Sequence, residues 1–164
     1  MTVAHNIYVH IPFCMSKCNY CAFFSRACAN PDWDTYVSEI LSEIDYWAKL
    51  LGKIDIPTIF FGGGTPSLIP VECFNKIIQQ LRASFNVLPN AEITLESNPG
   101  TLDKARLCEF IAYGVNRLSV GVQSLTDDEL SFLGRRHTVR DAMRLIDDAH
   151  AQSIRVFALW PGRP

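Results

Sequence analysis

Three cysteines near the start of the chain, Cys14, Cys18 and Cys21, lie within eight residues of one another. Thiolates are soft ligands that suit iron–sulfur clusters and zinc. A four-iron cluster has four corners, so three local thiolates leave one iron without a protein ligand. An open iron is what a cofactor or substrate needs in order to bind. The spacing therefore predicts a metal centre, and it favours a cluster over zinc.

Zinc remains the alternative to a cluster at this point. A closed zinc site needs a fourth ligand, which His10 or Cys28 could supply. Cys73 and Cys108 instead occupy apolar positions of helical patterns. There a cysteine behaves as a small hydrophobic side chain, so we expect these two to be buried rather than to bind metal.

Other residues with useful chemistry follow the predicted strands. Residues 62–64 are three glycines, which expose backbone amides, and Thr65 comes next. Glu96 ends a strand and could accept hydrogen bonds from hydroxyls or an amine, and Gln123 ends another and can donate and accept. Arg135 follows a helical turn, and its guanidinium suits a carboxylate. Because ligands gather at the carboxyl ends of parallel strands, we expect one shared site.

The elements that must position these residues alternate between strand and helix. Strands are predicted over residues 6–11, 58–61, 92–96, 116–122 and 154–159, and helices over 33–51, 74–81, 101–114, 127–133 and 138–149. This order predicts an α/β fold with a parallel sheet and helices packed outside it. An open Rossmann-type sheet and a TIM-like barrel both fit, although five strands cannot close a barrel of eight.

Polar residues mark where the helices should begin. Asp32 or Asn30 is expected to cap the first long helix, and Gly52 to end it. Thr101 is the predicted cap of the third helix and Thr138 that of the last.

The composition narrows the class of protein. The chain has 164 residues, 48% of them hydrophobic, and a formal net charge of −2. The length and composition fit one globular domain. The slightly negative net charge gives no indication of a nucleic-acid-binding protein. We see neither a signal-peptide pattern nor an apolar run long enough to span a bilayer. A cytoplasmic protein with reduced cysteines is expected.

Five motifs resemble those of radical S-adenosylmethionine (SAM) proteins. Residues 8–13 read YVHIPF and lead directly into the three-cysteine loop. The others are residues 60–67 (FFGGGTPS), 96–100 (ESNPG), 114–124 (GVNRLSVGVQS) and 133–137 (LGRRH). More narrowly, the chain resembles the branch that contains oxygen-independent coproporphyrinogen III oxidase and the heme chaperone HemW. Because these motifs occur in the family's order, an iron–sulfur cluster is strongly favoured over a zinc site.

The resemblance implies a fold, a cofactor and a set of contacts. The fold would be a partial, TIM-like (β/α)6 barrel with a [4Fe–4S] cluster on Cys14, Cys18 and Cys21. The methionine part of SAM would bind the fourth iron, and an electron from the cluster would cleave SAM to a 5′-deoxyadenosyl radical. A reductant protein and a heme or other tetrapyrrole are the implied partners. The residues implied to contact SAM are Tyr8, Tyr20, Gly63, Gly64, Thr65, Glu96, Gln123 and Arg135.

Within this branch, two features favour the chaperone. Phe23 stands where the oxidase carries an additional cysteine, and the first strand comes almost at once, whereas the oxidase has a longer preceding segment. The sequence thus predicts a HemW-like heme-binding protein. A porphyrinogen oxidase and an inactive fragment remain alternatives. His10 and His137 are possible heme ligands, although a structural role is more typical of such histidines.

The C-terminal stretch departs from the family. The family continues past the fifth strand with an acidic residue and a Gly-Leu-Pro-Gly-type turn, whereas residues 155–164 here read RVFALWPGRP. Arg155 is expected about where the acidic cofactor-binding residue would stand. Residues 1–164 are therefore predicted to form the N-terminal part of a radical SAM core, incomplete at its C-terminus, without the sixth strand and C-terminal domain.

Overall fold

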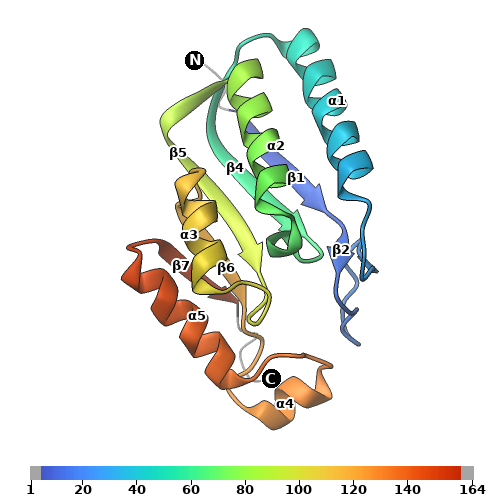
Figure 1. The fold of residues 1–164 in the computed structure, drawn as a ribbon, viewed down its shortest axis with the longest axis vertical. Helices are drawn as coiled ribbons and strands as arrows, with labels where there is room; N and C mark the ends of the chain where they lie inside the picture. Colours follow the sequence, from blue (N-terminus) through green and yellow to red (C-terminus); the bar gives the residue numbers. More distant parts are fainter. Residues whose placement is uncertain (1–4, 160–164) are drawn as a thin grey trace.

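A parallel sheet of five strands organises the protein (Figure 1). The computed structural model describes residues 5–159. The strands are β1 (Asn6–Ile11), β4 (Asp55–Gly63), β5 (Asn86–Ser97), β6 (Arg117–Gly121) and β7 (Arg155–Leu159). They lie side by side in that order, and each pairs in parallel with the next. The predicted α/β fold with parallel strands is confirmed.

The strand order decides between the two architectures that the sequence left open. A doubly wound Rossmann sheet reverses its order and places later strands on the far side of the first strand. Here spatial order equals chain order throughout. This is the arrangement of a barrel wall, which winds in one direction only.

Helices follow the strands in the same order. They are α1 (Trp33–Leu51), α2 (Val71–Ser84), α3 (Lys104–Ala112), α4 (Asp127–Phe132) and α5 (Val139–Ala151), with a short 3₁₀ helix at Pro66–Leu68. Helix α1 contacts α2, α2 contacts α3, and α3 contacts α5. Figure 1 shows these four helices side by side along the sheet. No helix in the described part of the chain is long and apolar enough to cross a membrane.

Aromatic side chains tie the sheet to its helices. The Phe61 ring of β4 lies 4.6 Å from that of Phe74 on α2, which in turn lies 5.1 Å from Phe110 on α3. All three are fully buried. They fix α2 and α3 against the middle of the sheet. The predicted burial of Cys73 is confirmed, whereas Cys108 is only partly buried.

The cysteine loop has more structure than the sequence predicted. We expected an irregular loop, but two short strands, β2 (Phe13–Cys14) and β3 (Arg26–Ala27), pair in parallel at its base. The Arg26 amide donates to the Pro12 carbonyl at 2.8 Å, and the Cys28 amide donates to the Cys14 carbonyl at 2.9 Å. Strands of two residues leave no periodic pattern in a sequence, which explains why they were missed.

Most of the predicted helix ends are correct. Asp32 caps α1 by accepting from the Thr35 amide at 3.1 Å, and Gly52 ends it at φ +67°. Thr138 and Asp141 form a reciprocal capping box at the start of α5.

The predicted cap of α3 is wrong. Asp103, not Thr101, accepts from the first turn of the helix. The Thr101 hydroxyl donates instead to the Asn98 carbonyl at 2.7 Å. The Thr101 hydroxyl is therefore bonded within a local turn and does not cap the helix, which begins two residues later than predicted.

Arg155 does not lie where the sequence comparison placed it. It begins β7 at the amino end, at the level of Arg117 and Thr94 on the neighbouring strands. Its Nη2 lies 3.0 Å from Glu92, in an ion pair. The predicted cofactor position would have to be at the carboxyl end of the strand, because the other site residues lie there. Residues 160–164 of the departing segment lie outside the described residues.

Candidate functional site

One pocket at the carboxyl ends of the strands collects the predicted site residues. All three cysteines line it, and so do seven of the eight predicted SAM contacts, all except Tyr8. Those lining residues are Cys14, Cys18, Cys21, Tyr20, Gly63, Gly64, Thr65, Glu96, Gln123 and Arg135. They come from the cysteine loop, from the carboxyl ends of β4 and β5, and from the segments that follow β4, β6 and α4. Parallel strands bring these segments together, as the sequence predicted.

The donor set of the pocket fits an iron–sulfur cluster. Cys14 is buried on β2, while Cys18 and Cys21 are partly exposed on the loop, and all three thiols are free. Between residues 5 and 159, no three His, Cys, Asp or Glu side chains converge closely enough to hold a single metal ion. A four-iron cluster is itself several ångströms wide, so its ligands surround a volume instead of meeting at a point.

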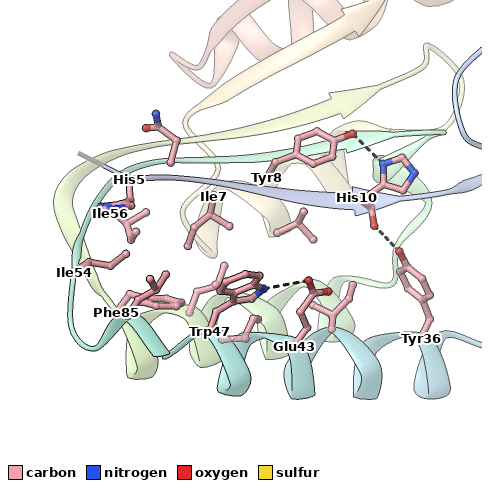
Figure 2. Close-up of a pocket in the computed structure, with 16 residues that line it drawn as sticks. His5, Ile7, Tyr8, His10, Tyr36, Glu43, Trp47, Ile54, Ile56 and Phe85 are labelled. Carbon is pink, nitrogen blue, oxygen red and sulfur yellow. Dashed lines mark hydrogen bonds between the residues drawn. The ribbon is translucent and has the colours of Figure 1, made fainter. Parts of the chain in front are cut away.

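The histidine proposed as a fourth zinc ligand is engaged elsewhere. His10 Nδ1 shares a hydrogen bond with the Tyr8 hydroxyl at 3.0 Å, and its Nε2 bonds the Phe24 carbonyl at 2.8 Å. Figure 2 shows the Tyr8–His10 contact. Cys28, the other candidate, does not line the pocket. The lining residues thus supply three cysteine thiols, and neither residue considered as a fourth zinc ligand is among them.

The glycine motif lies against the cysteine strand. The Gly64 amide donates to the Ile11 carbonyl at 2.7 Å, and the Thr65 amide donates to the Phe13 carbonyl at 2.9 Å. A Cβ on Gly64 would lie 2.8 Å from both Cys14 Sγ and the Phe13 carbonyl oxygen. Only glycine leaves enough space for this approach. The motif therefore fixes where the first thiol lies.

Glu96 provides the carboxylate of the pocket. Its Oε2 accepts from the Gly63 amide at 3.1 Å. Burial raises the pKa of Glu96, and the Gly63 hydrogen bond and the nearby His10 oppose this shift. A cationic ligand amine beside this carboxylate would favour its ionised form.

Arg135 provides the cation, and one of its donors is unused. Its Nη2 donates to Asn98 Oδ1 and to the Gly121 carbonyl, both at 2.6 Å, and its Nη1 lies 3.5 Å from Cys18 Sγ. Its Nε is buried and has no hydrogen-bond partner. A buried donor without a partner is costly, so this geometry suits an anion: a ligand carboxylate or a negatively charged cluster.

The remaining predicted contacts differ in their surroundings. Burial raises the pKa of Tyr20, against the opposing effect of Arg135. Gln123 has φ +69°, a conformation that residues other than glycine seldom adopt and that concentrates at functional sites.

Tyr8 instead lines a second pocket, between β1 and α1 (Figure 2), and its ring stacks on Phe60. Its contact with SAM stays a prediction.

Sequence reasoning missed two residues that organise this site. The Lys17 ammonium donates to the Phe23 and Ser25 carbonyls, at 3.1 and 3.0 Å, and holds the cysteine loop folded. Asn98 bridges Arg135 and Thr65 through its side-chain amide. Its only signal in the sequence was its place inside the motif of residues 96–100.

The histidines considered as heme ligands both hold structural positions. His137 is buried, and its Nε2 bonds the Val122 carbonyl at 3.0 Å. Burial and the neighbouring Arg135 lower the pKa of His137, which favours the neutral imidazole. Both His10 nitrogens are occupied, as described above.

Comparison with known sequences identifies the family of the chain. A model of the radical SAM superfamily matches residues 8–164. The "Heme chaperone HemW" of Escherichia coli (strain K12) is 38% identical over 155 residues, which are 94% of this chain and 41% of that protein. The mitochondrial "Radical S-adenosyl methionine domain-containing protein 1" of Danio rerio is 38% identical over 161 residues, 98% of this chain and 35% of that protein. The chain thus spans well under half the length of these relatives.

Solved structures show the same architecture. Coproporphyrinogen III oxidase (HemN) from Escherichia coli, described as a radical SAM enzyme, superposes with a TM-score of 0.91 at 25% identity, over 97% of this chain and 37% of that one. The radical SAM methyltransferase TsrM from Kitasatospora setae shares the fold, with a TM-score of 0.63 at 16% identity. The sheet is part of a radical SAM barrel, and the chain belongs to the radical SAM superfamily, with HemW and HemN among its relatives.

Proposed function

We propose that Cys14, Cys18 and Cys21 hold a [4Fe–4S] cluster, that SAM binds beside it, and that the protein serves heme delivery in the manner of HemW. One observation carries the first two parts. Three free thiols share a pocket with a partly buried arginine, whose buried Nε has no hydrogen-bond partner, and with a partly buried carboxylate. We propose the cytoplasm as its location.

The charges of the pocket match the two ends of an amino acid. The Glu96 carboxylate would accept from the amine of SAM, and the unused Nε of Arg135 would donate to its carboxylate. Thr65 and the glycine motif would approach SAM through small side chains and backbone. The cluster, when bound, supplies single electrons. The protein's share is to hold the ligand beside it and to exclude water.

Two observations favour the chaperone over the oxidase. The HemW relative is 38% identical to this chain, and the oxidase HemN is 25% identical. Phe23, which stands in place of the oxidase's additional cysteine, is 69% exposed and lines the cluster pocket. The high structural similarity to HemN supports the shared core and does not separate the two activities.

Electron paramagnetic resonance tests the cluster and the cofactor. The protein is reconstituted anaerobically with iron and sulfide, reduced, and measured with and without SAM. We expect a reduced four-iron signal that changes when SAM is added. The Cys18→Ser variant should lose the signal, and the matched Cys73→Ser variant, whose thiol lies in the core, should keep it. A wild-type protein that takes up no cluster would refute the proposal, and a signal indifferent to SAM would refute its second part.

Heme titration tests the chaperone role separately. We expect the cluster-loaded protein to give a Soret absorption change with stoichiometric heme and to leave coproporphyrinogen III unchanged in the presence of SAM and reductant. Release of 5′-deoxyadenosine coupled to loss of coproporphyrinogen III would instead establish the oxidase alternative. Neither heme binding nor turnover, with an intact cluster, would favour the inactive-fragment alternative.

A further inference from the structure

We infer that Asn98 is a positioning residue that sets the hydrogen-bond directions of two proposed SAM contacts, Arg135 and Thr65. Its Oδ1 accepts from Arg135 Nη2 at 2.6 Å, and its Nδ2 donates to Thr65 Oγ1 at 3.0 Å. A single amide thus connects the segment that follows α4 to the glycine motif that follows β4. The inference rests on the proposed SAM site.

The chemistry of the partners fixes which way the amide faces. A guanidinium has only donors, so the oxygen of the Asn98 amide must face Arg135. The amide nitrogen then faces Thr65, and the Thr65 oxygen must accept from it. The Thr65 hydroxyl proton is consequently directed away from Asn98. Since Thr65 is almost fully buried and lines the cysteine pocket, that proton is left free to donate to a ligand there.

The same amide restrains the guanidinium. Arg135 Nη2 is held between Asn98 Oδ1 and the Gly121 carbonyl, both at 2.6 Å. Fixing this end keeps Nη1 beside Cys18 Sγ, while Nε stays buried without a hydrogen-bond partner. Without Asn98, the Gly121 carbonyl alone would hold Nη2, and the guanidinium could turn away from the thiol.

Neighbouring groups hold the backbone of Asn98 and pack against its side-chain amide. The amide and the hydroxyl of Thr101 both donate to the Asn98 backbone carbonyl, at 3.1 and 2.7 Å. A Cβ on Gly121 would lie 3.0 Å from Asn98 Oδ1, which shows how closely the strand packs against the amide. Asn98 therefore needs no ligand to hold its orientation.

Nuclear magnetic resonance of the arginine side chain tests the restraint without cluster or SAM. In the wild-type apoprotein, we expect separate, slowly rotating Nη signals for Arg135, assigned by their loss in Arg135→Lys. Asn98→Ala should merge them, whereas Asn98→Asp, which keeps an acceptor, should not. Asn116→Ala is the matched control, because Asn116 also bonds through both ends of its amide, to Ile93 and Ala91, at the other end of β6. Unchanged Arg135 signals in Asn98→Ala would overturn the restraint.

SAM affinity of the cluster-loaded protein tests the consequence. Loss of residues that orient ligands typically weakens binding about 10- to 100-fold, and we expect this for Asn98→Ala with unchanged iron content. Asn98→Asp should also bind more weakly, because a carboxylate would draw the Thr65 proton away from the pocket. Asn116→Ala should bind SAM as the wild type does. Wild-type affinity in Asn98→Asp would refute the direction assigned to Thr65. If the wild type itself did not bind SAM, the proposed function would fail, while the resonance experiment would still decide the role of Asn98 toward Arg135.

Discussion

The Cys18 thiol and the Arg135 guanidinium are 117 positions apart in the chain, yet Nη1 and Sγ lie 3.5 Å apart. A guanidinium beside a thiolate ligand offers it a charge-assisted hydrogen bond. At the residue scale, this contact joins a donor from the segment after α4 to an acceptor on the cysteine loop. Two single residues of the pocket can be tested at this scale: the Glu96 carboxylate and the Gly64 backbone.

The Glu96→Gln variant should separate stability from ligand binding. Burial raises the folded-state pKa of Glu96 above its unfolded value of about 4.3, so the ionised side chain destabilises the fold. Below the unfolded-state pKa, where Glu96 is protonated in both states, the variant and the wild type should have similar free energies of unfolding. As the pH rises through the raised folded-state pKa, the variant should become the more stable protein. Urea unfolding of the apoprotein, measured at a series of pH values from about 4.3 upward, tests this difference.

SAM binding by Glu96→Gln should change in the opposite direction. Loss of a charge-assisted hydrogen bond to the ligand amine should weaken SAM binding roughly tenfold or more. Tight SAM binding by the variant, measured by calorimetry on the cluster-loaded protein, would argue against the assignment of Glu96 to the amine.

The Gly64→Ala variant should lose cluster. The added methyl group would lie 2.8 Å from Cys14 Sγ and from a backbone oxygen, so the thiol or the strand must move. We expect a clear fall in iron and sulfide per chain after reconstitution. Gly52→Ala is the control: its methyl meets nothing within 4 Å, but its φ of +67° imposes about 1 kcal/mol of backbone strain. Equal iron content in both variants would mean that the close approach of Gly64 to Cys14 is not needed.

At the element scale, helix caps and short strand pairings fix where the residues that follow each strand lie. Helix α5 begins at a capping box, in which Thr138 and Asp141 bond each other's backbone amides. It packs beside α3 and against β6 and β7. The start of α5 follows directly after Arg135 and His137, so the cap also ends the loop that carries the site arginine.

The Thr138→Ala variant should cost about 1 kcal/mol of unfolding free energy, because the side-chain cap is lost. The control is Thr126→Ala: Thr126 precedes α4 without a side-chain cap bond. Chemical denaturation of the two variants measures the difference. A Thr126→Ala variant as unstable as Thr138→Ala would show that the loss does not come from the cap.

At the scale of the whole molecule, the sheet has a centre and two edges. Strands β4, β5 and β6 each have a neighbour on both sides, whereas β1 and β7 each pair with one strand among the described residues. The largest buried side chains gather over the central strands and α2. Stability should therefore fall from the centre of the sheet to its edges.

Hydrogen exchange of the 164-residue chain should follow that gradient. We expect the amides of β4 and β5 to exchange slowest and those of β7 to exchange soonest. Strand β7 has one partner strand, and the Arg155 side chain that pairs with Glu92 is largely exposed. Mass spectrometry of peptides covering each strand measures this. Protection of β7 equal to that of β5 would show that the sheet opens as a single unit.

The sequence by itself predicted the five strands of the main sheet and the class of chemistry. Apolar periodicity located all five strands of the main sheet, and Asp32, Gly52 and Thr138 marked helix ends correctly, because these signals are local. The cysteine spacing and the family's motifs predict which cysteines bind metal, and that assignment stays a proposal. The motif resemblance also agrees with the superfamily to which the chain belongs.

Only the tertiary structure decided what depends on contacts between distant segments. The strand order selected the barrel wall over the doubly wound sheet, since strand periodicity carries no information about neighbours. The third helix begins at Asp103 because a turn takes the Thr101 hydroxyl, and Arg155 lies at the amino end of its strand, paired with Glu92. The unused Arg135 donor and the Asn98 bridge likewise arise only when three strand ends meet, and hydrogen-bond direction cannot be read from residue order.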